Sequence, residues 1–215
     1  MTAKIKLNAA SGGGSISIQA PSSSSNNRVI SLPDIADGTL LTSQSTLDST
    51  KLSPAISAGI TMLDVWTIST TADATSSGGD LTANWVRANS YQAVIGSAMT
   101  QSSGVFTFPS TGIYEVLFNA QFRYSNPYSR RYTTAMIDKV ISGSASMICE
   151  SASHISALSG NTYSIARCTA YFDVTDVSTH KVQFRTRAEG STGVVSEHSN
   201  SYLSTFVSFK RLGDT

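Results

Sequence analysis

Serine and histidine are the residue types in this chain that could support nucleophilic catalysis. The sequence holds 38 serines and three histidines, His154, His180 and His198. A serine nucleophile needs a base within hydrogen-bond reach. Among so many serines, some lie near a histidine by chance, so such proximity is no evidence of catalysis. The sequence has no Gly-x-Ser-x-Gly motif, and Ser142-Gly143-Ser144 lacks the strand and helix that such a nucleophile requires. We therefore expect the histidines to be surface residues near turns.

Carboxylates could cleave glycans if two of them lay about 5–10 Å apart in a groove. The candidates are Glu150, Asp173, Asp176, Glu189 and Glu197. They form no recognisable pair, and Asp173 and Asp176 flank a predicted turn, where side chains are usually solvated. The histidines also lack the His-x-x-x-His spacing of a metal site. We expect no enzyme activity, no metal and no cofactor, and a glycan-cleaving enzyme is a weaker alternative.

The two cysteines, Cys149 and Cys168, are too few for a disulfide scaffold or a four-ligand zinc site. They fall on two runs that the pattern predicts to be neighbouring strands. Cys168 shares an apolar face with Phe172, and Cys149 alternates with Met147. Buried free thiols are the expected state, and a disulfide across the strands is the alternative.

Tyrosine and arginine gather in the predicted loop 125–132, SNPYSRRY. Both side chains bury much surface and offer hydrogen bonds to sugars or to protein edges. Tyr128, Arg130, Arg131 and Tyr132 are therefore the candidate ligand-contact residues. In the other interpretation, the tyrosines pack against a second copy of the chain or cap the domain.

Charge is scarce in this chain, and hydroxyl groups supply its polarity. Charged residues make up 13% of the chain, the formal net charge is +1, and there are 38 Ser and 24 Thr. A near-neutral chain lacks the basic patch that binds phosphates, so nucleic acid is not an expected partner. No apolar run reaches the ~20 residues that span a bilayer. The start, MTAKIKLNAASGGGS, has no apolar stretch typical of a secretory signal.

Alternation of apolar and polar residues through residues 61–215 predicts strands. The clearest runs are 113–124, 164–174 and 181–187, and the run 201–212 is apolar on both faces, as in a central strand. Turn clusters rich in Ser, Gly and Asn separate these runs. We expect eight to ten antiparallel strands and no helix, which indicates an all-β sandwich, specifically an antiparallel jelly roll.

The composition changes near residue 60, because all 18 aromatic residues follow it. Without aromatics, residues 1–60 cannot build a core of their own. Two short alternating runs, 4–7 and 15–19, still predict strands, whereas 43–60 is a connector of unassigned conformation. We expect a β-rich segment over 1–60 and a separate domain over 61–215. A flexible linker is the alternative for the first segment.

The stretch GVFTFPSTGIYEVLFNAQF, residues 104–122, resembles the signature of complement globular-head and tumour-necrosis-factor-like jelly rolls. The matching residues are Phe106, Phe108, Pro109, Gly112, Tyr114 and Phe118. Residues 202–206 look like the aromatic-rich last strand of that family. The resemblance implies a homotrimeric jelly roll. It places five aromatic residues in the core or at the trimer contact: Phe106, Tyr114, Phe118, Tyr202 and Phe206. No acidic residues match the family's calcium sites.

The segment before the jelly roll resembles a block common in bacteriophage fibre proteins. The matching residues are NRVISLPD at 27–34 and DGTLLT at 37–42. Such a block usually lies before the distal domain, in the part that attaches or trimerises. The resemblance implies that five apolar residues attach the chain to other virion proteins: Val29, Ile30, Leu32, Leu40 and Leu41.

Together these observations predict a homotrimeric bacteriophage structural protein that is assembled in the host cytoplasm and located in the virion. Residues 1–60 would attach it, and the head would bind a host-surface glycan or protein, as a tail fibre does. Trivalent display would strengthen weak single contacts. A capsid decoration or head-fibre protein is the main alternative, and a glycan-degrading tailspike is the weakest. Neither nucleic acid nor a membrane is an expected partner.

Overall fold

The structure, a computed structural model, divides into two compact units, Met1–Leu47 and Asp48–Thr215. The residues that it describes are 4–8, 11–19, 59–82, 84–88, 94–125, 129–190, 194–196 and 202–215. We call the second unit the head. The division predicted at residue 60 stays a prediction.

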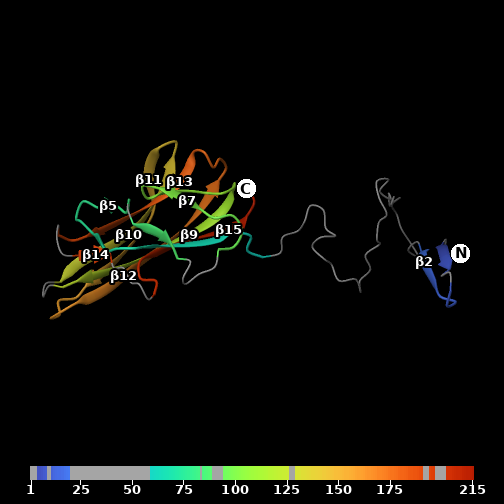
Figure 1. Cartoon of the computed structure of the whole chain (residues 1–215), viewed down its shortest axis with the longest axis horizontal. Coiled ribbons are helices and arrows are strands. Elements are labelled where there is room, and N and C mark those ends of the chain that lie inside the picture. Colours follow the sequence, from blue (N-terminus) through green and yellow to red (C-terminus); the bar gives the residue numbers. More distant parts are fainter. Residues whose placement is uncertain are drawn as a thin grey trace, which may run out of the picture. The chain divides into compact units, whose positions relative to one another are not determined.

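The described part of the first unit is a two-stranded antiparallel hairpin (Figure 1). Its strands are β1 (Lys4–Asn8) and β2 (Ser15–Gln19). Gly12 and Gly13 lie between them at φ +85° and +73°, a conformation that glycine adopts without strain. The two predicted strands are therefore confirmed, and they pair with each other.

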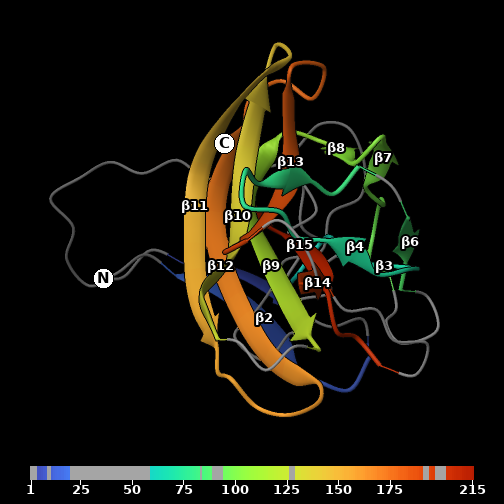
Figure 2. The ribbon, with the colours of Figure 1, turned by 90° about the vertical axis from the view of Figure 1, so that its left-hand side faces the viewer.

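The head is a sandwich of two antiparallel sheets, and Figure 2 shows its long curved strands. One sheet, which we call the front sheet, has the order β12-β9-β15-β3-β6, with β14 and β4 continuing beside the end of β9. Its strands are β3 (Leu63–Ile68), β4 (Ala72–Asp73), β6 (Trp85–Arg87), β9 (Gly112–Tyr124), β12 (Thr162–Val174), β14 (Val194–Ser196) and β15 (Phe206–Gly213).

The other sheet, the back sheet, has the order β11-β10-β13-β8-β7, with β5 paired to β13. Its strands are β5 (Gly79–Asp80), β7 (Thr100–Ser102), β8 (Val105–Thr107), β10 (Arg130–Ile141), β11 (Ser144–Ile155) and β13 (His180–Ala188). The described residues contain no helix, and so no helix among them could span a membrane. The described part of the chain is all-β, and the head is the antiparallel jelly-roll sandwich that the sequence predicted. Its described residues form thirteen strands, several only two or three residues long, where eight to ten were expected.

Alternation fixes which side of each long strand faces the core. In β9 and β12, residues with even numbers, such as Phe118 and Phe172, are buried, while their odd-numbered neighbours face outward. The predicted runs 113–124, 164–174 and 181–187 are confirmed as β9, β12 and β13. The run 201–212 was predicted as a central strand. A strand between β9 and β3 is confirmed, but β15 begins only at Phe206, and residues 202–205 lie outside it.

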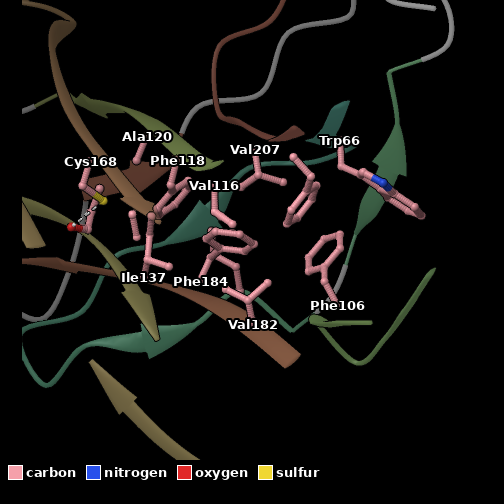
Figure 3. Packing of buried hydrophobic residues seen from close by; sticks show 14 of the residues in the cluster. Trp66, Phe106, Val116, Phe118, Ala120, Ile137, Cys168, Val182, Phe184 and Val207 are labelled. Carbon is pink, nitrogen blue, oxygen red and sulfur yellow. Dashed lines mark hydrogen bonds between the residues drawn. The ribbon is translucent and has the colours of Figure 1, made fainter. Parts of the chain in front are cut away.

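Aromatic rings fill the space between the sheets. Phe106 is fully buried, and its ring centroid lies 5.1–5.5 Å from those of Trp66, Trp85, Phe184 and Phe209. Figure 3 shows Phe106 and Phe184 among aliphatic side chains of both sheets. Edge-to-face and tilted ring pairs of this kind add to the free energy gained by burying apolar surface.

The hairpin of β10 and β11 differs from the sequence prediction. Residues 125–132 were expected to form one loop, but β10 begins at Arg130. The two strands join through Ser142 and Gly143, both at positive φ, as in the tight turns that match strand twist. The run is hard to recognise because β10 is buried on both faces along much of its length, so its residues do not alternate.

Candidate functional site

Arg130 packs inside the head, beside the strand that carries Tyr124. Its guanidinium lies 4.5 Å from the centre of the Tyr124 ring, and its Nη2 donates to the Tyr124 hydroxyl at 2.5 Å. A Cβ at Gly190 would come within 2.8 Å of the same guanidinium, so this glycine makes room for it. Arg130 therefore stacks on and bonds its own chain, a cation–π contact of ordinary geometry.

Arg131 is the exposed member of the predicted contact residues, with 82% of its side chain accessible. Glu189 accepts hydrogen bonds from its backbone N–H at 2.6 Å and from its Nε at 2.5 Å. These two bonds, the backbone one first, lower the pKa of the Glu189 carboxyl. The guanidinium of Arg187 lies over the ring of Tyr132, 5.2 Å from the centre of that ring. Tyr128 lies outside the described residues, as do the predicted attachment residues Val29, Ile30, Leu32, Leu40 and Leu41.

The front sheet presents an apolar surface to solvent. On β12, Tyr163, Ile165 and Tyr171 are 50%, 53% and 66% exposed. Leu117 of β9, which pairs with Thr169, and Phe206 of β15, which pairs with Asn119, also point outward on this sheet and are half-buried. We call these five residues the front face. Arg167 and Thr169 separate Ile165 from Tyr171 on β12, so the surface is apolar with polar interruptions. Large apolar side chains exposed together on one face of a soluble domain are candidates for an interaction surface.

Hydrogen bonds and an ion pair connect the strands in the middle of the same sheet. Asn119 is buried on its outward side, where it accepts from Arg167 Nε at 3.0 Å and donates to the Ser204 carbonyl at 2.7 Å. Lys210 and Glu115 form an ion pair at 2.7 Å. These bonds hold the front face on three adjacent strands in one fixed arrangement.

The predicted aromatic contact residues separate into two groups. Phe106, Tyr114 and Phe118 are fully buried within the head. Tyr202, by contrast, is 59% exposed, and Phe206 is half-buried on the front face. Only the second group is accessible to another chain in this structure.

A groove of about 610 Å³ opens where β11 and β12 form neighbouring edges of the two sheets. It is lined by Lys139, Ile141, Ile148, Thr169, Ala170, Tyr171, Phe172, Asp173 and His180. Ile148 is the extra residue at a register shift between β10 and β11. Such a β-bulge changes the direction in which the side chain points. The sequence prediction placed Cys149 and Cys168 on neighbouring strands but missed this groove, because the strand β10 was not recognised and the sequence does not show which sheet edges meet.

The groove's histidine is hydrogen-bonded to the turn that precedes β13. The Nδ1 of His180 lies 3.1 Å from both the Asp176 carbonyl and the Thr179 hydroxyl. Asp176 accepts bonds from Ser178 and Thr179, and the Ser178 bonds chiefly lower the pKa of its carboxyl. In the described ranges, no group of three His, Cys, Asp or Glu side chains is placed to hold a metal ion.

Both cysteines are free, with Cys168 buried and Cys149 half-buried. The Cys168 Sγ lies 3.6 Å from the Ala135 carbonyl oxygen. Burial, and next the nearby Cys149, raise the pKa of the Cys168 thiol to about 12. The strands that carry them, β11 and β12, lie side by side but belong to different sheets.

Solved structures share the fold of the head. Eiger TNF from S. frugiperda is 11% identical to the chain, with a TM-score of 0.52, over 73% of this chain and 96% of that one. Murine APRIL at pH 5.0 is 12% identical, with a TM-score of 0.49, over 70% of this chain and 98% of that one. No family model and no curated protein matches the sequence. The head therefore has the jelly-roll fold of tumour-necrosis-factor-like proteins.

Proposed function

We propose that this chain is a homotrimeric structural protein of a bacteriophage virion, whose head binds the host surface. The observation that carries the trimer is the front face, an exposed apolar surface on a jelly roll of the tumour-necrosis-factor type. A second and third copy would remove these side chains from water, which is the main favourable term in association. A net charge of +1 keeps repulsion between identical chains small.

Three heads held together would present three copies of each weak contact. Binding of one copy raises the effective concentration of the others at the same surface, so avidity exceeds single-site affinity. Arg131, exposed beside Glu189 at one end of β10, is available for such a contact. In this proposal the protein acts by display and not by catalysis.

Residues 1–60, which include the hairpin of β1 and β2, attach the trimer to other virion proteins in this proposal. The division of the chain into two compact units supports a separate role for the first part. The resemblance of residues 27–42 to phage fibre proteins points to the virion as the place of attachment.

Light scattering coupled to size-exclusion chromatography of the full chain tests the trimer. The expected mass is three times 22.7 kDa. Ile165→Arg places three charges in the proposed contact and should yield monomers, because an unpaired buried charge is costly. Leu158→Arg is the matched control, since Leu158 is 60% exposed and lies between β11 and β12, outside the front face. A monomeric wild-type chain would refute the trimer.

Electron microscopy of phage particles labelled at the carboxyl terminus of this chain tests the virion role. Labels at the tail, in multiples of three, support a fibre that binds the host. Labels spread over the capsid lattice would instead indicate decoration or a head fibre. Particles without any label would overturn the virion assignment.

A further inference from the structure

Two thiols lie near each other where the edges of the two sheets meet. Cys149 lies on β11, the edge strand of the back sheet, and Cys168 lies on β12, the edge strand of the front sheet. The Cys149 Sγ donates to the carbonyl of Thr169 at 3.4 Å, one residue along from Cys168. Cys149 is also near enough to Cys168 to raise the pKa of its thiol. Their side chains therefore occupy the same gap between the sheets.

The two sulfur atoms differ in access. Cys168 is only 5% exposed, whereas Cys149 is half-buried on the strand that borders solvent. A dissolved oxidant therefore reaches Cys149 first. Cys168 is then placed as the second, resolving thiol, because it lies behind Cys149 on the core side.

We propose that Cys149 and Cys168 form an intramolecular disulfide when the folded head meets a small-molecule disulfide, and that this bond ties the two sheets together. The bond would close the chain between residues 149 and 168. It would join β11, which has a paired neighbour on one side only, to the front sheet. The site is independent of the proposed virion role.

The reaction takes two exchange steps. First, the Cys149 thiolate attacks one sulfur of the oxidant R–S–S–R, which forms a mixed disulfide on Cys149 and releases RS⁻. Second, the Cys168 thiolate attacks the Cys149 sulfur and releases the second RS⁻. The two thiol protons end on the two released RSH molecules. Cysteine sulfur is oxidised and the small disulfide is reduced, so atoms and electrons balance.

Burial of Cys168 controls the rate of the second step. Only the thiolate is nucleophilic, and the pKa of Cys168 is raised to about 12. Burial, the largest cause of this shift, persists in the mixed disulfide, so the thiolate fraction of Cys168 rises about tenfold per pH unit below its pKa. In the folded head, closure of the bond should accelerate in proportion as the pH rises from 7. In urea, where the thiol is no longer buried, this rise should level off near the ordinary cysteine pKa of about 8.5.

The test uses the reduced full chain, oxidised glutathione and mass spectrometry of the digested protein. The expected product is one peptide pair joined through Cys149 and Cys168, with two hydrogen atoms lost and no glutathione retained. The oxidised chain should also unfold at a temperature higher by about 5 °C or more. Circular dichroism before and after oxidation shows that the fold is kept.

Two single variants separate the roles of the thiols. Cys168→Ser should accumulate the glutathione adduct on Cys149, because no second thiol resolves it. Cys149→Ser should leave the buried Cys168 unmodified in the folded chain. The proposal is overturned if the folded wild-type chain keeps both thiols titratable, keeps glutathione on Cys149 at every pH, or links two chains through these residues.

Discussion

Phe106 shows how one residue gathers a core from both sheets. It lies on β8 of the back sheet, yet its ring meets Trp66 and Phe209 of the front sheet as well as Phe184 of its own. The sequence marks Phe106 through its place in the Phe-x-Phe-Pro run before a long strand. Its neighbours could not be predicted, because they come from segments far apart in the chain.

Phe106→Ala should lower the free energy of unfolding by about 3–5 kcal/mol, the usual cost of emptying a buried aromatic site. Urea denaturation followed by tryptophan fluorescence measures it, since Trp66 and Trp85 flank the site. Leu158→Ala is the control: Leu158 is 60% exposed and should change stability little. Equal losses for the two variants would contradict the described core.

Glu189 should titrate below its usual pKa of 4.5, because Arg131 donates two hydrogen bonds to the ionised carboxylate. A lowered pKa in the folded state means that this contact stabilises the head above about pH 4.5 and is lost as pH falls through the folded value. NMR titration of the carboxyl carbon measures it. Arg131→Ala should raise the pKa only in part, since the backbone N–H still donates. A Glu189 pKa at or above 4.5 in the wild-type chain would contradict the contact.

The sequence did not predict the burial of a charged side chain. Asp64 is fully buried and accepts hydrogen bonds from Trp66 Nε1 at 3.0 Å, Arg87 Nε at 3.1 Å and the Met99 N–H at 2.9 Å. Two of these partners lie 23 and 35 residues away. An aspartate in an apolar run gives no sign of which distant donors will meet it.

At the scale of elements, alternation predicted the strands that are buried on one face and exposed on the other. β9, β12 and β13 were found in this way. β10 was missed because the segment that includes β5 crosses its outer side, where Gly78 lies beside Met136, so that both faces are buried. β11 was predicted only as a run around Cys149, without bounds, because half of its residues are Ser or Ala and give little apolar contrast. The edge groove between β11 and β12 could not be predicted without β10 and the full extent of β11.

The turn between β10 and β11 gives a test at the same scale. Gly143 has φ +84° with open space around it, so Gly143→Ala should cost about 1 kcal/mol from backbone strain alone. Gly79→Ala is a matched control, because Gly79 also has open space but no positive φ. Denaturant unfolding of both variants measures the difference. Equal effects of the two substitutions would contradict the left-handed turn.

At the scale of the whole molecule, the split into two compact units predicts that the head is independent of the first unit. A chain lacking residues 1–47 should keep its circular dichroism spectrum and thermal midpoint, because the core cluster lies in the head. It should no longer join virions if the proposed attachment role holds. Sedimentation of particles assembled with the shortened chain measures this. Unchanged incorporation would refute the attachment role, and loss of the folded spectrum would refute the independence of the head.

The position of β15 has a consequence for how the head is made. Residues 206–213 lie between β3 and β9, the earlier strands with which they pair. During synthesis, both of these strands must therefore wait with unpaired edges until the ribosome has delivered the last strand. Pairings between segments far apart in the chain form slowly. Until they form, the unpaired strand edges are exposed and prone to aggregation. A nascent chain stalled before residue 206 should accordingly be the species that chaperones bind and proteases remove.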